Sequence, residues 1–106
     1  MSCNVVISFE AEEDIQGIYD YIKHNLCAPK AAARTANKIY EQIISLDASP
    51  KRYRLYDREP WKSRGLRKMP VDNFVVLYIV DENSKTVTVL RVFYGGRDID
   101  KLIVDL

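Results

Sequence analysis

The 106-residue sequence lacks most of the features that mark a secreted, metal-binding or membrane protein. Its two cysteines, Cys3 and Cys27, are too few for a disulfide framework and have no second ligand at metal-binding spacing. Its apolar runs fall far short of the roughly 20 residues that cross a bilayer, and the N-terminus lacks the basic stretch of a secretory signal. These absences predict a cytoplasmic protein with free thiols, no metal, no cofactor and no membrane partner.

The whole chain has almost no net charge, but positive charge is concentrated in one segment. The net charge is +1, which excludes a uniform nucleic-acid-binding surface. Residues 51–70, however, hold eight lysines and arginines against two acidic residues, while residues 1–50 and 71–106 are both net acidic. The basic segment is a local footprint for a polyanion, although a solvated loop or a face for an acidic protein partner explains it equally well. The single histidine, His24, lies far from this segment in the sequence, so it is a poor catalytic candidate.

The periodicity of apolar residues predicts one domain, residues 1–106, in the order β-α-α-β-β-β. A strand is expected at 4–8, helices at about 9–26 and 29–48, a basic loop at 51–67, and then three strand-like runs that include 71–80 and 86–94. Residues 99–106 form a short tail, expected to be one helical turn. The predicted fold class is α+β, a two-layer sandwich in which a helical hairpin packs on one face of a small antiparallel sheet.

Local signals fix the expected helix starts and buried faces. Ser8 suits a helix N-cap, and Pro29 suits the first position of the second helix, where its missing N–H has no cost. Apolar side chains recur at helical spacing in both helices, which predicts that each buries one stripe: Ile15, Ile18, Tyr19, Ile22 and Leu26 in the first, and Ala32, Ala36, Ile39, Tyr40, Ile43 and Leu46 in the second.

Four stretches together resemble a known family over nearly the whole chain: AEEDIQGIYDYI, AAARTANKIYEQIISLDASPKRY, GLRKMPVDNFVVLYIVDE and VTVLRVFYGGRD. Their order and spacing are similar to those of the RelE/ParE toxins of bacterial type II toxin–antitoxin modules, also labelled plasmid stabilisation proteins. The resemblance implies a RelE-like fold, inhibition of growth, and a cognate antitoxin that binds the toxin in a hetero-oligomer. RelE-type members cleave mRNA on the ribosome, whereas some ParE-type members inhibit DNA gyrase.

Metal-free RNA cleavage needs a base for the 2′-OH, cations on the phosphate, and an acid for the leaving oxygen. Arg67 and Arg97 are the predicted phosphate ligands, with Arg97 matching the family's arginine after the glycine at the end of the last strand. Lys68 is the candidate base and Tyr94 a candidate acid or base, with Glu59 a weaker one beside Pro60. The candidates for RNA binding are a tryptophan and cations in or near the basic segment: Trp61, Lys62, Arg64 and Arg91.

The sequence also departs from the nuclease pattern. RelE-type nucleases carry an arginine directly after the aromatic residue of the central strand, where this chain has Val75 after Phe74, and its tail has no tyrosine. Tyr94 stands where the ParE side commonly has a histidine. The concentrated basic segment nevertheless makes a ribosome-dependent mRNA interferase, an endoribonuclease, the first prediction. The alternatives are a non-enzymatic gyrase inhibitor and an inactive toxin fold that only binds its antitoxin.

Overall fold

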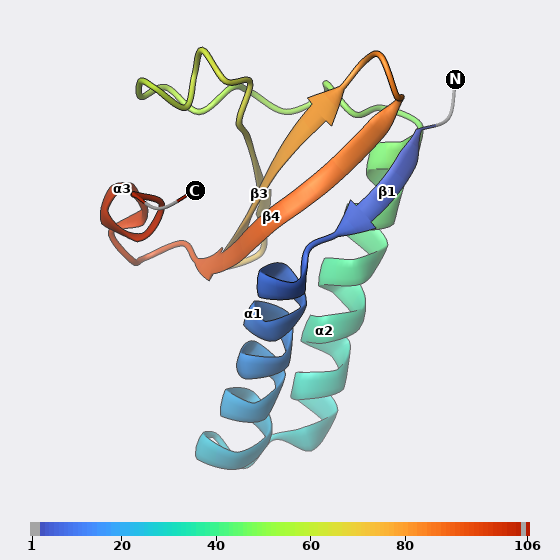
Figure 1. Cartoon of the computed structure of the whole chain (residues 1–106). Coiled ribbons are helices and arrows are strands. Elements are labelled where there is room, and N and C mark those ends of the chain that lie inside the picture. The colour runs from blue at the N-terminus through green and yellow to red at the C-terminus, as the bar shows by residue number, and fades with distance from the viewer. Residues whose placement is uncertain (1–2, 105) are drawn as a thin grey trace.

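The computed structural model describes residues 3–104 and 106 and shows a helical hairpin joined to a four-stranded sheet (Figure 1). The predicted tail includes Asp105, which lies outside the described residues. The elements in chain order are β1 (Asn4–Ile7), α1 (Phe9–Asp20), a π-helical turn η1 (Tyr21–Asn25), α2 (Pro29–Ile44), a 3-10 turn η2 (Ser45–Asp47), β2 (Arg67–Val71), β3 (Phe74–Asp81), β4 (Thr86–Tyr94) and α3 (Ile99–Leu102). The predicted order β-α-α-β-β-β and the α+β class are confirmed.

The sheet is mixed, which corrects the prediction of an antiparallel sheet. Its strand order is β1-β4-β3-β2, and β2, β3 and β4 form an antiparallel meander. β1 lies parallel to β4, with Asn4 opposite Thr86 and Ile7 opposite Val89. Local turn signals predict the meander because its strands are joined by short turns. They carry no information about β1, whose partner lies more than 80 residues further along the chain.

The turn between β2 and β3 divides one predicted strand. The run expected at 71–80 is interrupted directly after Val71, where Asp72 adopts a left-handed backbone conformation with φ 52°. Asp and Asn tolerate this conformation better than most residues, so Asp72 and Asn73 form a tight turn that apolar periodicity alone does not reveal. The predicted turn between β3 and β4 is confirmed, with Lys85 also at φ 52°.

Both helices begin as predicted. The Ser8 hydroxyl accepts a hydrogen bond from the N–H of Ala11 (3.0 Å), and Pro29 is the first residue of α2. The first helix ends earlier than the predicted position at about 26, because regular α-helical bonding stops at Asp20 and the chain widens into η1. Leu26, predicted to lie on the buried stripe, is 56% exposed beyond this turn.

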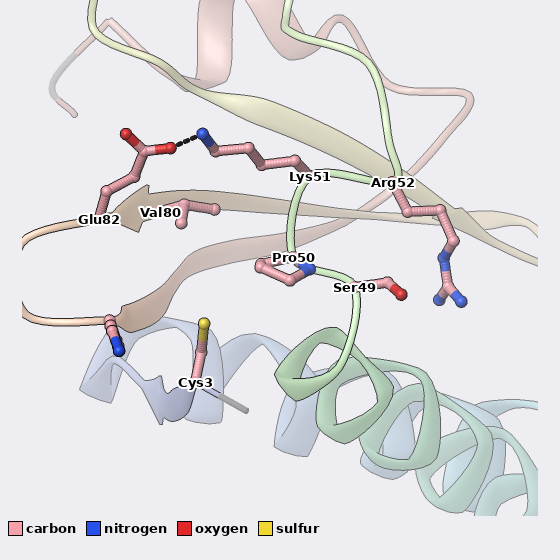
Figure 2. A pocket seen from close by; sticks show the side chains of 8 residues that line it. Cys3, Ser49, Pro50, Lys51, Arg52, Val80 and Glu82 are labelled. Carbon is pink, nitrogen blue, oxygen red and sulfur yellow. Dashed lines mark ion pairs between the residues drawn. The ribbon is translucent and has the colours of Figure 1, made fainter. Parts of the chain in front are cut away.

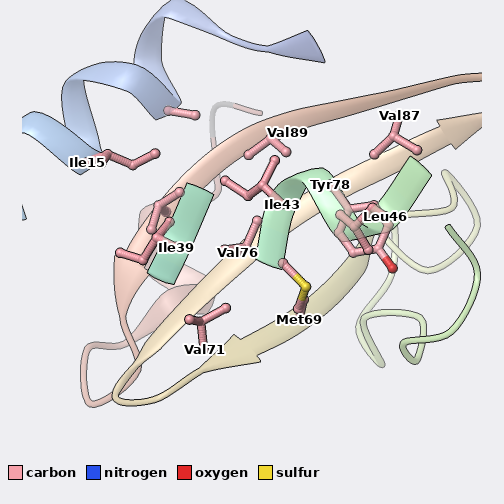
Figure 3. Packing of buried hydrophobic residues seen from close by; sticks show 12 residues of the cluster. Ile15, Ile39, Ile43, Leu46, Met69, Val71, Val76, Tyr78, Val87 and Val89 are labelled. Atoms are coloured by element: carbon pink, nitrogen blue, oxygen red, sulfur yellow. The ribbon is translucent and has the colours of Figure 1, made fainter. Parts of the chain in front are cut away.

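The main core lies between the helical hairpin and one face of the sheet (Figure 3). The buried helical residues Ile15, Ile39 and Ile43 meet side chains of all four strands, including Val76 and Val89. The stripe predicted for the second helix is largely buried, since Ala32 and Leu46 are also fully buried, whereas only Ile15 of the first stripe is fully buried. These contacts hold the hairpin on this side and leave the other sheet face for the remaining chain.

The opposite face of the sheet carries a second, smaller core. Leu77 of β3 and Phe93 of β4 are covered there by Tyr56 and Leu66 of the long loop and by Ile103, directly after α3. The predicted tail thus includes the expected helical turn, and it packs on a face of the sheet instead of fraying. The basic loop and the tail come together on this side, which creates the cavity described next.

Candidate functional site

A small cavity on the second face of the sheet gathers cationic and acidic side chains. We call it the basic hollow, and its volume is about 290 Å³. Lys68 of β2 and Arg97, in the turn between β4 and α3, line it together with Val75 of β3. The rest of its wall comes from the loop and the start of the tail: Tyr56, Gly95, Asp98, Ile99 and Asp100. Two of the four predicted catalytic residues, Lys68 and Arg97, therefore lie in one cavity.

The polar groups of the basic hollow are already joined to each other. The Tyr56 hydroxyl donates a short hydrogen bond to Asp100, and the Arg58 guanidinium lies 3.3 Å from the same carboxylate. Burial, together with this hydrogen bond, raises the pKa of Tyr56 above its usual value, so the phenol is neutral at physiological pH. The Lys68 ammonium lies over the Tyr56 ring, 5.8 Å from its centre. The network ties the long loop to α3 beneath the two cations.

Arg67 does not join this group. Neighbouring side chains of a strand point to opposite faces, so Arg67 faces the side of Met69 and Val71 while Lys68 faces the hollow. Its guanidinium donates a hydrogen bond of 2.7 Å to the carbonyl of Tyr53. Arg67 lies close to the turn between β3 and β4, near Asp81, at the other end of β3 from Arg97.

Arg91, predicted to bind RNA, has its guanidinium engaged by the first helix. Its Nε and a terminal nitrogen donate to the two carboxylate oxygens of Asp14 at 2.7 and 2.9 Å. The Asp14 carboxylate also accepts the N–H of Val92 at 2.9 Å. This hydrogen bonding raises the pKa of Arg91 further above its usual value. The pair links α1 to β4.

Tyr94 lines a different cavity from Lys68, an apolar groove between α1 and the ends of β3 and β4. We call this the helix–strand groove, and its volume is about 580 Å³. Its walls are mainly apolar: Ile18, Tyr21, Ile22, Leu26, Phe74, Val92, Phe93 and Tyr94. Arg97 lines both this groove and the basic hollow, so the two cavities meet at that side chain.

The remaining predicted residues lie in the basic loop. The Trp61 ring packs against the second core and carries the Arg64 guanidinium 5.0 Å from its centre. Lys62 is exposed. The Glu59 carboxylate accepts hydrogen bonds from the N–H and hydroxyl of Ser63, which lower the pKa of Glu59. This local bonding favours a loop-stabilising role for Glu59 over proton transfer.

A further pocket of about 540 Å³ lies at the end of the sheet where β1 begins (Figure 2). Cys3, Pro50 and Val80 form its apolar wall, and Lys51 pairs with Glu82 across its rim. Within residues 3–104 and 106, no group of three or more histidine, cysteine, aspartate or glutamate side chains is arranged to hold a metal ion. Over the same residues, no helix combines the length and apolar character needed to cross a membrane.

Sequence reasoning missed Tyr56 and Asp100 in the basic hollow. The two residues lie 44 positions apart and occur in segments expected to be a loop and a tail. The available signal was weak: a tyrosine between the cations of the basic loop, and acidic residues directly after Arg97. Their pairing depends on the loop and tail meeting on one sheet face, which no local pattern indicates.

Comparisons with known proteins agree on the architecture. Residues 5–99 match the family described as ParE toxin of type II toxin-antitoxin system, parDE. Compared with curated protein sequences, the chain has no significant match. Among solved structures, a chain of the chromosomal ParDE TA system from P. aeruginosa is similar with a TM-score of 0.71 and 22% identity, covering 88% of this chain and 96% of that one.

Two further structures share the fold at low sequence identity. A chain of the toxin–antitoxin complex RelBE2 from Mycobacterium tuberculosis superposes with a TM-score of 0.65 and 21% identity, covering 89% of this chain and 99% of that one. A mutant of the E. coli toxin RelE in the free state superposes with a TM-score of 0.66 and 10% identity, covering 96% of this chain and 93% of that one. At such identities the likeness concerns the fold alone.

Proposed function

Because the chain belongs to the ParE family of toxins from type II toxin–antitoxin systems, we propose that it inhibits growth by binding DNA gyrase and not by cleaving RNA. The partner that neutralises it is a cognate antitoxin, as in the complexes to which its fold is similar. The cytoplasm, where gyrase lies, is the proposed location.

The observation that supports this proposal is the separation of the residues predicted to cleave RNA. In-line attack by a 2′-OH requires a base, an acid and phosphate-binding cations around one phosphate. Arg67 points to the other face of the sheet and is bonded to the backbone of Tyr53. Tyr94 lines the helix–strand groove, whereas Lys68 lines the basic hollow. A protein that acts only by binding gyrase does not need these residues to surround one phosphate.

The chemistry of the basic hollow adds to the argument. Val75, in its wall, is an apolar side chain where the nuclease branch has an arginine. Asp98 and Asp100 lie beside Lys68 and Arg97, so much of the positive charge is balanced within the cavity. Such a site presents hydrogen-bond donors and acceptors to a protein surface more readily than it concentrates a polyanion.

RNA cleavage is the second candidate, and one feature favours it. Lys68 and Arg97 line the same cavity, and Asp100 lies in its wall as well. In this alternative the two cations bind the scissile phosphate and the Asp100 carboxylate accepts the proton of the attacking 2′-OH. The Tyr56 phenol, whose hydrogen bond to Asp100 must first break, donates a proton to the leaving oxygen.

One pair of assays separates the two candidates. Purified toxin is added to a gyrase supercoiling reaction and, separately, to a reconstituted bacterial translation reaction whose mRNA 3′ ends are mapped. We expect loss of supercoiling and intact mRNA. Codon-phased, ribosome-dependent cuts with normal supercoiling would reject the gyrase proposal.

The same assays test the basic hollow. Arg97→Ala is expected to weaken inhibition by at least about tenfold, as for a central arginine of a binding surface. Lys30→Ala serves as the matched control, because it removes an exposed cation at the start of α2. Full inhibition by the Arg97 variant would exclude the hollow from target binding.

A further inference from the structure

We propose that the pocket at the start of β1 binds a small organic anion that has an apolar body and a carboxylate group. We call it the β1 pocket, and its lining includes Cys3, Pro50, Lys51, Val80, Glu82 and Lys85. The site is independent of the proposed function, because the β1 pocket and the basic hollow share no lining residue. Its size, its apolar wall, its rigid frame and its excess of positive charge carry the inference.

The β1 pocket has the size and the wall of a small-molecule site. Its volume of about 540 Å³ lies within the range of roughly 300–1,000 Å³ that is usual for such sites. Cys3, Pro50 and Val80 form the apolar wall, and Figure 2 shows the Cys3 thiol pointing toward the other two side chains. Cys3 and Val80 also pack against the main core, so the wall continues into the protein interior. The apolar body of a ligand is removed from water on this wall.

Hydrogen bonds to the backbone hold the frame of the β1 pocket before a ligand arrives. The N–H of Cys3 donates to the last carbonyl of η2, and the N–H of Asn4 donates to the carbonyl of Lys85, both at 2.8 Å. The Pro50 carbonyl accepts the hydroxyl of the buried Tyr78, also at 2.8 Å. These bonds join the start of β1, the chain after α2 and the turn between β3 and β4. A cavity with such a fixed frame loses little conformational entropy when a ligand binds.

The charges of the lining favour an anion. Lys51, Arg52 and Lys85 contribute three positive charges, and Glu82 contributes the single negative charge, which leaves a net charge of +2. Lys51 pairs with Glu82 across the rim (Figure 2), and the Arg52 guanidinium donates to the Ser45 hydroxyl at 3.0 Å. Within the part of the chain that the structure describes, Lys85 has no carboxylate partner. Its ammonium is therefore the group that binds the carboxylate of a ligand.

The combination of one available ammonium with an apolar wall distinguishes the ligand class. Phosphate groups and nucleotides gain most from several donors that converge on their oxygens, and the wall of Cys3, Pro50 and Val80 does not supply them. A carboxylate that carries a hydrocarbon chain uses both parts of the β1 pocket. Its charged end reaches Lys85, and its chain covers the apolar wall.

Octanoate is a suitable probe, because it joins one carboxylate to an apolar chain. Its binding to the purified full chain is measured by titration of the backbone amide NMR signals. We expect saturable shifts at the residues of the β1 pocket with a Kd of about 1 mM or tighter, which requires only an ordinary binding efficiency per ligand atom. The matched probe is 1-octanol, which keeps the chain without the charge, and we expect it to bind at least about fivefold more weakly.

Variants at two lining positions test where the probe binds. Cys3→Phe fills the β1 pocket from its wall and is expected to weaken octanoate binding at least about tenfold, whereas Cys3→Ala, which leaves the space open, should change it less than about threefold. Lys85→Glu reverses the charge that binds the carboxylate, with an expected loss of at least about fivefold. Lys30→Glu makes the same change at an exposed lysine that does not line the pocket, and it should change binding less than about twofold.

Alkylation of the two thiols provides an independent readout. Octanoate should slow the reaction of Cys3 with iodoacetamide in proportion to its occupancy, because the Cys3 thiol lies in the wall that the ligand covers. Cys27 is exposed between η1 and α2 and does not line the β1 pocket, so its alkylation should not change. Mass spectrometry of the two cysteine peptides measures both rates in one sample.

Several results would overturn the proposal. Absence of saturable shifts or of Cys3 protection would reject the site, and equal binding of 1-octanol would reject the role of charge. Equal losses for Lys85→Glu and Lys30→Glu would mean that octanoate responds only to the overall charge of the protein. Circular dichroism confirms that each variant is folded. If Cys3→Phe does not fold, the comparison of Lys85→Glu with Lys30→Glu decides, and wild-type affinity of Lys85→Glu rejects the site.

Discussion

Asp14 completes an edge of the sheet that β1 leaves open. β1 ends at Ile7, opposite Val89, whereas β4 continues for several more residues. The Asp14 carboxylate accepts the N–H of Val92 on this uncovered stretch and binds Arg91 at the same time. A helix side chain thereby takes the place of a further strand residue and fixes the angle between α1 and β4.

Asp14→Ala is therefore expected to destabilise the protein by about 2–3 kcal/mol, because it leaves a charged guanidinium and a backbone N–H without their acceptor. Urea unfolding measures the difference. Glu13→Ala, one residue away and exposed, should change the free energy of unfolding by less than about 0.5 kcal/mol. Equal effects of the two substitutions would mean that the ion pair adds no stability.

Tyr78 makes the free energy of unfolding depend on pH in the alkaline range. It is fully buried, its hydroxyl donates to the carbonyl of Pro50 at 2.8 Å, and burial raises its pKa above the usual value of 10.0. A raised pKa in the folded state means that stability is complete below about pH 10 and is lost as the pH rises toward the folded-state pKa. Tyr78→Phe should show a smaller loss of unfolding free energy between pH 9 and about pH 11, measured by urea titration. An identical pH slope in both proteins would contradict this role.

At the scale of elements, β4 shows what the alternation of buried and exposed residues along a strand can and cannot predict. Its apolar residues at 87 and 89 predict a buried face, and both are buried. The pairing with β3 then shifts, since Leu77 lies opposite Arg91 while Tyr78 lies opposite Val89. This bulge leaves one extra residue in β4 and changes which side chains face the helices. No residue pattern in the sequence marks the position of this bulge, so the face to which Arg91 points could not be predicted.

Ile103, directly after α3, makes a buried contact that attaches α3 to the sheet. Ile103 is fully buried in the second core, and the adjacent Val104 is 69% exposed. Ile103→Ala is expected to lower the free energy of unfolding by about 2–4 kcal/mol and to accelerate amide exchange in α3 while α1 and α2 stay protected. Val104→Ala is the control, with an expected change below about 0.5 kcal/mol. Unchanged exchange in α3 would show that it is held by other contacts.

At the scale of the whole molecule, the order of elements was predictable and the assembly of the site only in part. Helix caps, apolar stripes and turn residues are local signals, and they correctly predict the helical hairpin and the meander. Lys68 and Arg97 were named from the sequence and share a cavity. Arg67 was named with them, but its position directly before Lys68 in a strand sends it to the opposite face. Tyr56 and Asp100 were not found, because their contact joins two irregular segments.

The parallel pairing of β1 with β4 has a consequence for how the toxin is made. The Ser8 hydroxyl donates to the carbonyl of Leu90, 82 residues later, so the first strand has no partner until the last one has been synthesised. At about 5–20 residues per second, ribosomes need roughly 4–16 s to bridge that interval. Until β4 and the turn after it have been made, the chain can form neither its four-stranded sheet nor the cavity that Arg97 lines.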